Sequence, residues 1–147
     1  MSGKKQSNQM EGWSWVHSKE GMYLQCEALR ENGFKHGFFT REWRDMSPKE
    51  LIRFLDCRFS IHKVNQIHGS NVIKASNASQ PPWPSADSLI SDKKRQSLWI
   101  YSADCIPVLF ADPVMGHVAA VHSGWKGISN RVLLKTIEAL KQLGAVE

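Results

Sequence analysis

Short apolar runs bounded by turn-forming residues recur along the chain and predict short β-strands. The clearest pair covers residues 107–111 and 117–121, with Asp112, Pro113 and Gly116 between them. Because two strands joined by a short turn lie antiparallel and side by side, this pair predicts a hairpin. Further strands are expected at residues 23–26, 34–41, 61–64, 72–74, 87–90 and 98–101.

Three further expectations concern the placement of these runs. The run at residues 23–26 is expected at a sheet edge. The runs at 61–64 and 72–74 enclose a turn ending in Gly69, so His68 is expected at the tip of a second hairpin. Three prolines make residues 76–85 a loop within a domain.

Helical signals are fewer. Ser47, Pro48 and Glu50 form a capping box with proline at the first helical position, which predicts a short helix. Apolar residues at helical spacing predict a second helix over 129–143, ended by Gly144. Strands mixed with few helices indicate an α/β fold of the mixed α+β kind, with layered sheets and flanking helices.

The composition limits the class of protein. A chain of 147 residues fits one domain, expected over residues 12–147 after a disordered tail at 1–11. The formal net charge is +5, but basic residues are scattered and no apolar run approaches bilayer length. We therefore expect neither nucleic acid nor a membrane as partner. Three cysteines, an odd number, favour reduced thiols in a cytoplasmic protein.

The 107–121 hairpin brings candidate metal ligands together. Cys105 precedes its first strand and His122 follows its second, so a thiol and an imidazole lie at the same end. With His68 they offer two imidazoles and one thiolate, which hold zinc in three positions and leave the fourth for water. This arrangement is typical of catalytic zinc sites.

Two other interpretations use the same residues. Cys105 can act as a nucleophile with His122 as its base, and with Asp87 or Asp104 orienting the histidine. In the other interpretation these residues form no functional site: Cys105 is buried, and His68 and His122 lie in turns and bond to the backbone.

Two cationic residues are candidates for binding an anionic co-substrate such as phosphate. Arg41 can grip an anion through two hydrogen bonds, whereas Lys126 offers a point charge within the glycine-bracketed turn 123–127. Trp125 and Phe39 can stack on a planar base, although such rings more often belong to a core.

Five motifs in order resemble the laccase-domain family, also called multicopper polyphenol oxidases or purine nucleoside phosphorylases of the YfiH and YlmD type. The motifs are Gly37-Phe38-Phe39-Thr40-Arg41, Gln66-Ile67-His68-Gly69, Asp87-Ser88-Leu89-Ile90, Ala103-Asp104-Cys105-Ile106-Pro107-Val108-Leu109 and Val121-His122-Ser123-Gly124-Trp125-Lys126-Gly127. The resemblance implies a mixed α/β domain whose zinc ligands are His68, Cys105 and His122. It also implies phosphorolysis of adenosine, inosine and methylthioadenosine, together with deamination of adenosine.

The resemblance leaves two alternatives and shows two departures. A copper-dependent polyphenol oxidase is the first alternative, but such enzymes need several coppers and many histidines, and this chain has six. A non-catalytic metal- or nucleoside-binding module is the second. Lys126 replaces the arginine that is usual in the family's last motif. Similar proteins also continue well past residue 147, so the domain is expected to be incomplete at its C-terminus. The motifs predict no oligomeric state.

Overall fold

The computed structural model describes residues 10–146. The chain forms two compact units, an N-terminal unit (Met1–Cys57) and a C-terminal unit (Arg58–Glu147), which we describe separately. Most of the predicted disordered tail lies outside the described residues, and the expectation of one domain over 12–147 stays a prediction. Among the residues described, no helix has the length and apolar character needed to cross a membrane.

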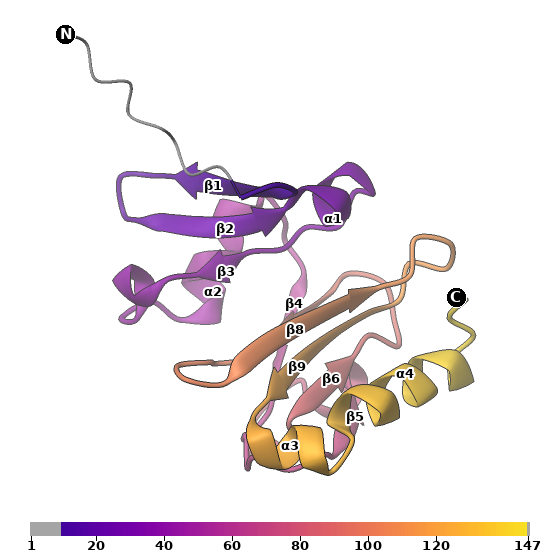
Figure 1. Cartoon of the computed structure of the whole chain (residues 1–147). Coiled ribbons are helices and arrows are strands. Elements are labelled where there is room, and N and C mark those ends of the chain that lie inside the picture. Colours follow the sequence, from indigo (N-terminus) through magenta and orange to yellow (C-terminus); the bar gives the residue numbers. More distant parts are fainter. Residues whose placement is uncertain (1–9, 147) are drawn as a thin grey trace, which may run out of the picture. The chain divides into compact units, whose positions relative to one another are not determined.

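The N-terminal unit is built on a three-stranded antiparallel sheet in the order β1-β2-β3 (Figure 1). Its strands are β1 (Trp13–His17), β2 (Met22–Cys26) and β3 (Phe38–Phe39). The prediction that 23–26 is an edge strand is wrong, because β2 pairs with β1 on one side and with β3 on the other. The predicted strand at 34–41 is also too long. The His36 ring, bonded to the amide of Cys26, occupies the position where a longer strand would have to pair.

Short helices complete this unit: α1 (Glu27–Glu31), η1 (Arg41–Trp43), α2 (Pro48–Leu51) and η2 (Ile52–Leu55). The capping box is confirmed, since the Ser47 amide and hydroxyl both donate to the Glu50 carboxylate, at 2.8 and 2.7 Å. The helix tightens into 3₁₀ geometry and ends at Asp56, whose φ is +49°. Packed aromatic rings form the interior: Tyr23, Phe39, Trp43 and Phe54.

The C-terminal unit contains two sheets and a 3₁₀ turn, η3 (Ala75–Asn77). A two-stranded parallel sheet joins β4 (Ser60–Lys63) to β7 (Gln96–Trp99). A four-stranded mixed sheet follows the order β5-β6-β9-β8. Its strands are β5 (Val72–Lys74), β6 (Ser88–Ile90), β8 (Ile106–Ala111) and β9 (Val118–Ser123).

The sheet topology confirms one predicted hairpin and corrects the other. Strands β8 and β9 pair antiparallel as expected, although His122 lies within β9 and pairs with Pro107. His68 is not at a hairpin tip. The strands before and after it, β4 and β5, belong to different sheets and pair in parallel with β7 and β6. His68 instead lies in the connection between two sheets.

Two helices follow β9: α3 (Trp125–Ser129) and α4 (Val132–Gln142). The segment 123–127, predicted as a turn, enters helix α3 at Trp125. The predicted helix 129–143 begins only at Val132, because Arg131 adopts a left-handed φ of +62° and separates the two helices. Gly144, with φ +96°, ends α4 as expected.

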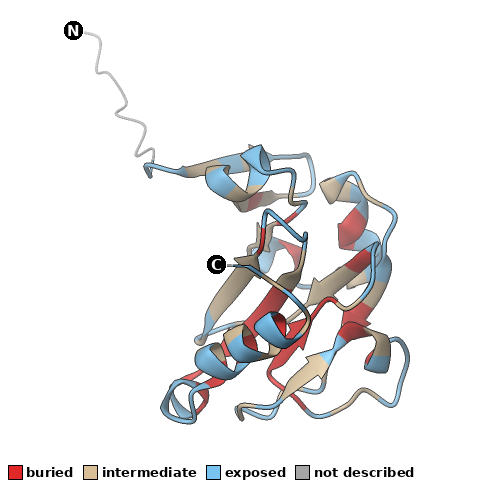
Figure 2. Ribbon diagram, turned by 90° about the vertical axis from the view of Figure 1, so that its right-hand side faces the viewer, coloured by how far each residue is buried: buried red, intermediate tan, exposed pale blue. Residues whose placement is uncertain are grey.

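Helix α4 packs on the four-stranded sheet, and the interface between them is the core of this unit. Ile90, Ala119 and Leu140 form a buried apolar cluster. The Thr136 hydroxyl donates to the Val132 carbonyl at 2.7 Å, so the Ser88 hydroxyl donates to Thr136 across the same interface at 2.8 Å. Figure 2 shows the buried residues gathered along the strands beside this helix, whose outward side is exposed. The mixed α/β class predicted from the sequence is confirmed, and the sheet ends carry the site described next.

Candidate metal centre

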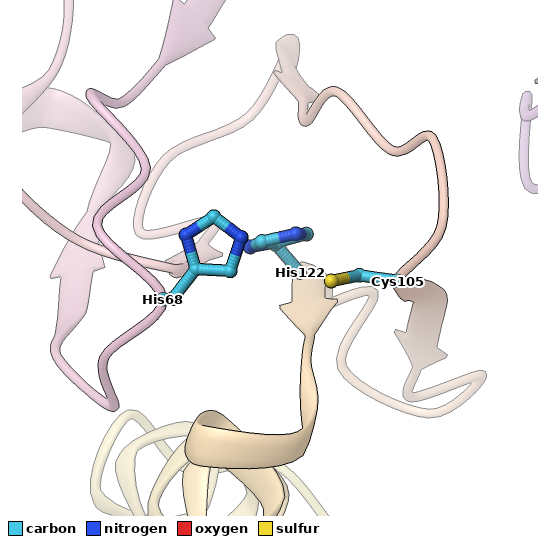
Figure 3. Close-up of side chains that lie close together, drawn as sticks. All are labelled: His68, Cys105 and His122. Atoms are coloured by element: carbon cyan, nitrogen blue, oxygen red, sulfur yellow. The ribbon is translucent and has the colours of Figure 1, made fainter.

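The side chains of His68, Cys105 and His122 converge on one point of the C-terminal unit. Their nearest ligand atoms, two imidazole nitrogens and one sulfur, all lie within 4.8 Å of one another. Figure 3 shows the three side chains pointing toward a common centre from the 64–71 connection, from the start of β8 and from the end of β9. The two imidazole rings meet edge to face, with centroids 4.8 Å apart.

The hairpin register explains the approach of Cys105 to His122. Ile106 pairs with Ser123 and Pro107 with His122, so the residue before β8 must lie beside the end of β9. The Ser102 hydroxyl donates to the Cys105 carbonyl and so holds the turn that presents the thiol. Antiparallel pairing alone was enough to predict this half of the site.

A buried carboxylate orients His122. Asp87 is fully buried and its Oδ1 lies 2.8 Å from His122 Nδ1. Because an ionised carboxylate can only accept, Nδ1 carries the proton and the Nε2 lone pair is left for a metal. A metal-ligating histidine with a carboxylate behind its other nitrogen is the usual arrangement in zinc proteins.

The same carboxylate also holds the turn that carries His68. It accepts the backbone amides of Ile67 at 3.2 Å, His68 at 2.9 Å and Gly69 at 2.7 Å. These bonds secure His68 in a left-handed conformation, φ +58°, that a residue with a side chain seldom adopts. Burial acts to raise the pKa of Asp87, but the bonds from His122 and from the three amides outweigh it and hold that pKa below its usual value.

Two glycines allow helix α3 to approach the centre. A Cβ added at Gly124 would lie 3.0 Å from Cys105 Sγ and 3.5 Å from His68 Cδ2. A Cβ at Gly127 would lie 3.0 Å from the carbonyl oxygen of Gly69. Because both distances are at or inside contact, the backbone of α3 forms one wall of the centre.

The donor set fits a metal ion. Zinc bound to nitrogen at about 2.0 Å and sulfur at about 2.3 Å in tetrahedral geometry needs ligand atoms about 3.5 Å apart. Separations of no more than 4.8 Å reach this spacing with small side-chain movements. His122 is buried, Cys105 partly buried and His68 exposed, so the centre is open on the His68 side. An open side is what a three-ligand catalytic site requires.

The remaining predicted residues lie in different places. Asp104 is exposed in the turn before β8, so Asp87 is the carboxylate that contacts His122. Arg41 begins η1 of the N-terminal unit. Lys126 lies in α3, with its Nζ 5.6 Å from the centre of the Trp125 ring.

Sequence reasoning missed one support of the centre. The Gln66 side-chain amide bonds both the amide and the carbonyl of Tyr101, each at 2.7 Å, and so ties the His68 connection to the segment that leads to Cys105. Its position two residues before His68 was visible in the sequence, but its partner, 35 residues away, was not.

Comparison with known proteins identifies the family. The model of the multi-copper polyphenol oxidoreductase laccase family matches residues 48–147. The chain belongs to this family. The resemblance inferred from the five motifs is thereby confirmed.

Two curated relatives are similar along most of the chain. A protein of Synechocystis named purine nucleoside phosphorylase is 37% identical over 139 residues, which cover 90% of this chain and 52% of that protein. A protein of the same name from Clostridium acetobutylicum is 32% identical over 133 residues, or 88% of this chain and 53% of its own length. The chain thus spans about half the length of these curated relatives.

Solved structures confirm the fold. A Neisseria meningitidis protein aligns at a TM-score of 0.55 and 33% identity, covering 65% of this chain and 41% of its own. YfiH of Bacillus licheniformis aligns at 0.54 and 27%, covering 66% and 40%. YlmD of Geobacillus stearothermophilus, at 0.56 and 24% over 63% and 38%, supports the fold alone.

Proposed function

We propose that this laccase-family chain carries the metal centre of a zinc-dependent purine nucleoside enzyme. The observation that carries the proposal is the imidazole of His122, set by Asp87 with its Nε2 free, beside Cys105 and His68. Zinc bound there supplies Lewis acidity at a coordination position open to substrate. Relatives named purine nucleoside phosphorylase support the substrate class at the level of the family.

The proposed reactions are phosphorolysis and deamination. Phosphorolysis converts adenosine, inosine or methylthioadenosine to the free base and the corresponding ribose 1-phosphate. Deamination hydrolyses adenosine with one water, which breaks the C6–N bond and gives inosine and ammonia. In the proposal, His68, Cys105 and His122 hold the metal, and the bond from His122 Nδ1 to Asp87 orients the ring so that Nε2 serves as the ligand atom. We further propose that the protein is cytoplasmic.

Phosphate binding is proposed for Arg41 and Lys126. Lys126 lies two residues after Gly124, where an added Cβ would lie 3.0 Å from Cys105 Sγ, and this closeness in the chain supports a role beside the centre. An ammonium binds phosphate as a point charge and lacks the two-pronged grip of the family's usual arginine. This difference favours weaker phosphate binding with deamination retained.

The test is a turnover assay of the zinc-loaded protein on adenosine, inosine and methylthioadenosine, with and without phosphate. Free base that appears only with phosphate, and ammonia released from adenosine alone, support the two proposed reactions. Lys126→Met is expected to lower phosphorolysis and spare deamination, whereas Lys94→Met, on an exposed turn, is the matched control. Bound zinc without any turnover would overturn the enzymatic proposal and leave a non-catalytic binding module.

Copper is the second candidate because two imidazoles and a thiolate also suit that metal. The family description, a multi-copper oxidoreductase, is the observation that favours it. Copper in the purified protein together with oxidation of a phenol would support the oxidase. Oxidation that persists in Cys105→Ala would argue against this centre as its source.

A further inference from the structure

Trp125 is the most exposed large aromatic side chain among the residues described. Its relative exposure is 76%, although indoles are usually among the most buried side chains of a protein. It is the first residue of α3 and directly follows Gly124. An indole left open to solvent beside a candidate metal centre is a feature that packing does not explain.

Chain geometry limits how far this residue can be from the metal ligands. A Cβ on Gly124 would touch Cys105 Sγ at 3.0 Å, and successive Cα atoms are about 3.8 Å apart. The Cα of Trp125 is therefore within about 8 Å of the sulfur. Side chains of a helix lean toward its N-terminus, which for α3 is the end at Gly124. The indole is thus attached to the backbone close to the centre, at the helix end that faces it.

The neighbouring charge adds chemistry. The Lys126 ammonium is 5.6 Å from the centroid of the Trp125 ring, at a distance typical of a cation–π contact. Most of the ring stays accessible despite this contact. The ammonium lies over one face of the ring, so a flat aromatic ligand would stack on the other face.

We propose that the Trp125 indole is the surface on which the purine base of the substrate stacks, which makes Trp125 a substrate-positioning residue. The inference rests on the proposed function and specifies how that site recognises its substrate class. A purine offers a flat π-face that stacks on an aromatic side chain whatever its exocyclic group. Stacking through Trp125 thus accounts for one site that accepts both adenine and hypoxanthine nucleosides.

Tyr101 is the rival for this role. It is 73% exposed, and the Gln66 amide holds its backbone at both the amide and the carbonyl. Its Cα is joined to Cys105 through the four-residue segment that the Ser102–Cys105 bond closes, a longer path than the one from Trp125 through Gly124. The experiment below therefore includes Tyr101 as a separate variant.

The test measures binding of inosine to the zinc-loaded protein by calorimetry, and KM and kcat in the turnover assay. Trp125→Ala is expected to weaken inosine binding about tenfold, whereas Trp125→Phe retains most of it because a phenyl ring still stacks. KM should rise by the same factor in Trp125→Ala, with kcat and zinc content unchanged. Val114→Ala, an exposed apolar residue in the turn at the opposite end of the β8–β9 hairpin, is the control and binds as the wild type does.

The outcomes separate this inference from the proposed function. If inosine binding depends on Trp125 but no base or ammonia is released, the enzymatic proposal fails and the role of Trp125 in stacking the purine base is supported. If turnover proceeds and Trp125→Ala keeps the wild-type KM, or if Tyr101→Ala alone raises it, the stacking role is overturned and the enzyme stands. A zinc-loaded wild type that binds neither inosine nor adenosine overturns both.

Discussion

Asp87 Oδ1 lies 2.8 Å from His122 Nδ1, in the interior of the C-terminal unit. The same oxygen accepts the backbone amide of His68 at 2.9 Å. One buried carboxylate therefore fixes the ring of one candidate ligand and the backbone of another. Two segments that lie in separate parts of the sequence are tied together by this residue, which comes directly before β6.

The role of Asp87 predicts a specific defect in Asp87→Asn. The asparagine NH₂ group cannot accept, so at least one of the four bonds to this side chain is lost. We expect zinc affinity to fall about 10- to 100-fold and the free energy of unfolding to fall by about 1–3 kcal/mol. Asp104→Asn, on an exposed turn, is the control. Competition with a chelating dye and urea unfolding measure both quantities, and equal zinc affinity of the two variants would contradict the assignment.

Gly124→Ala tests the close approach of α3 to the centre. The backbone of Gly124, at φ −76° and ψ 167°, suits alanine, so the new methyl group strains no backbone angle. Its only tight contact is Cys105 Sγ at 3.0 Å. We expect zinc affinity to fall at least tenfold because the sulfur must move, while the thermal midpoint of the metal-free protein changes little.

Gly116→Ala is the control for Gly124→Ala: it strains the backbone but adds no contact. Gly116 has φ +79° with open space around it, so alanine there strains the backbone and touches nothing. We expect a stability loss of about 1 kcal/mol with unchanged zinc affinity. If both glycine variants lose zinc affinity in proportion to stability, the contact between α3 and Cys105 has no specific role.

Cys105→Ala separates a metal ligand from a nucleophile. As a ligand, the thiolate is needed to retain zinc, so metal and turnover should disappear together. Cys26→Ala, in the N-terminal unit, is expected to keep both. Zinc that stays bound at full stoichiometry while turnover is lost would instead assign Cys105 as the nucleophile.

Asp92 predicts a dependence of stability on pH. Burial acts to raise its pKa, but hydrogen bonds from Ser76 and Gln96 outweigh it and hold the pKa below its ordinary value of about 3.9. A group whose pKa is lowered by folding stabilises the protein above its unfolded pKa, and the contribution is lost as the pH falls through the folded pKa. The stability difference between wild type and Asp92→Asn should therefore be constant from pH 7 to about 5 and shrink below about 4. A difference that stays unchanged down to pH 3 would contradict this.

Local patterns in the sequence predicted the local parts of the structure. The β8–β9 hairpin and the Ser47 capping box depend on residues a few positions apart, and both are confirmed. The hairpin also placed Cys105 beside His122, because antiparallel register follows from the turn.

The parallel pairing of β4 with β7 and of β5 with β6 could not be predicted from the sequence. The closeness of β4 and β5 in the chain predicts a hairpin with His68 at its tip, yet each of these strands pairs with a strand more than ten residues further on. Parallel strands carry no turn between them that a sequence pattern could reveal. The choice of Asp87 over Asp104 likewise depends on burial, and burial follows from β6 lying inside the sheet.

The central claim is that His68, Cys105 and His122 form one zinc site. The most direct measurement is the metal content of the purified chain by elemental analysis, with Cys105→Ala and His122→Ala prepared in parallel. We predict one zinc per wild-type chain and none in either variant, with all three proteins folded by circular dichroism. A folded wild type without zinc after incubation with excess metal, or variants that retain a full equivalent, would contradict the claim.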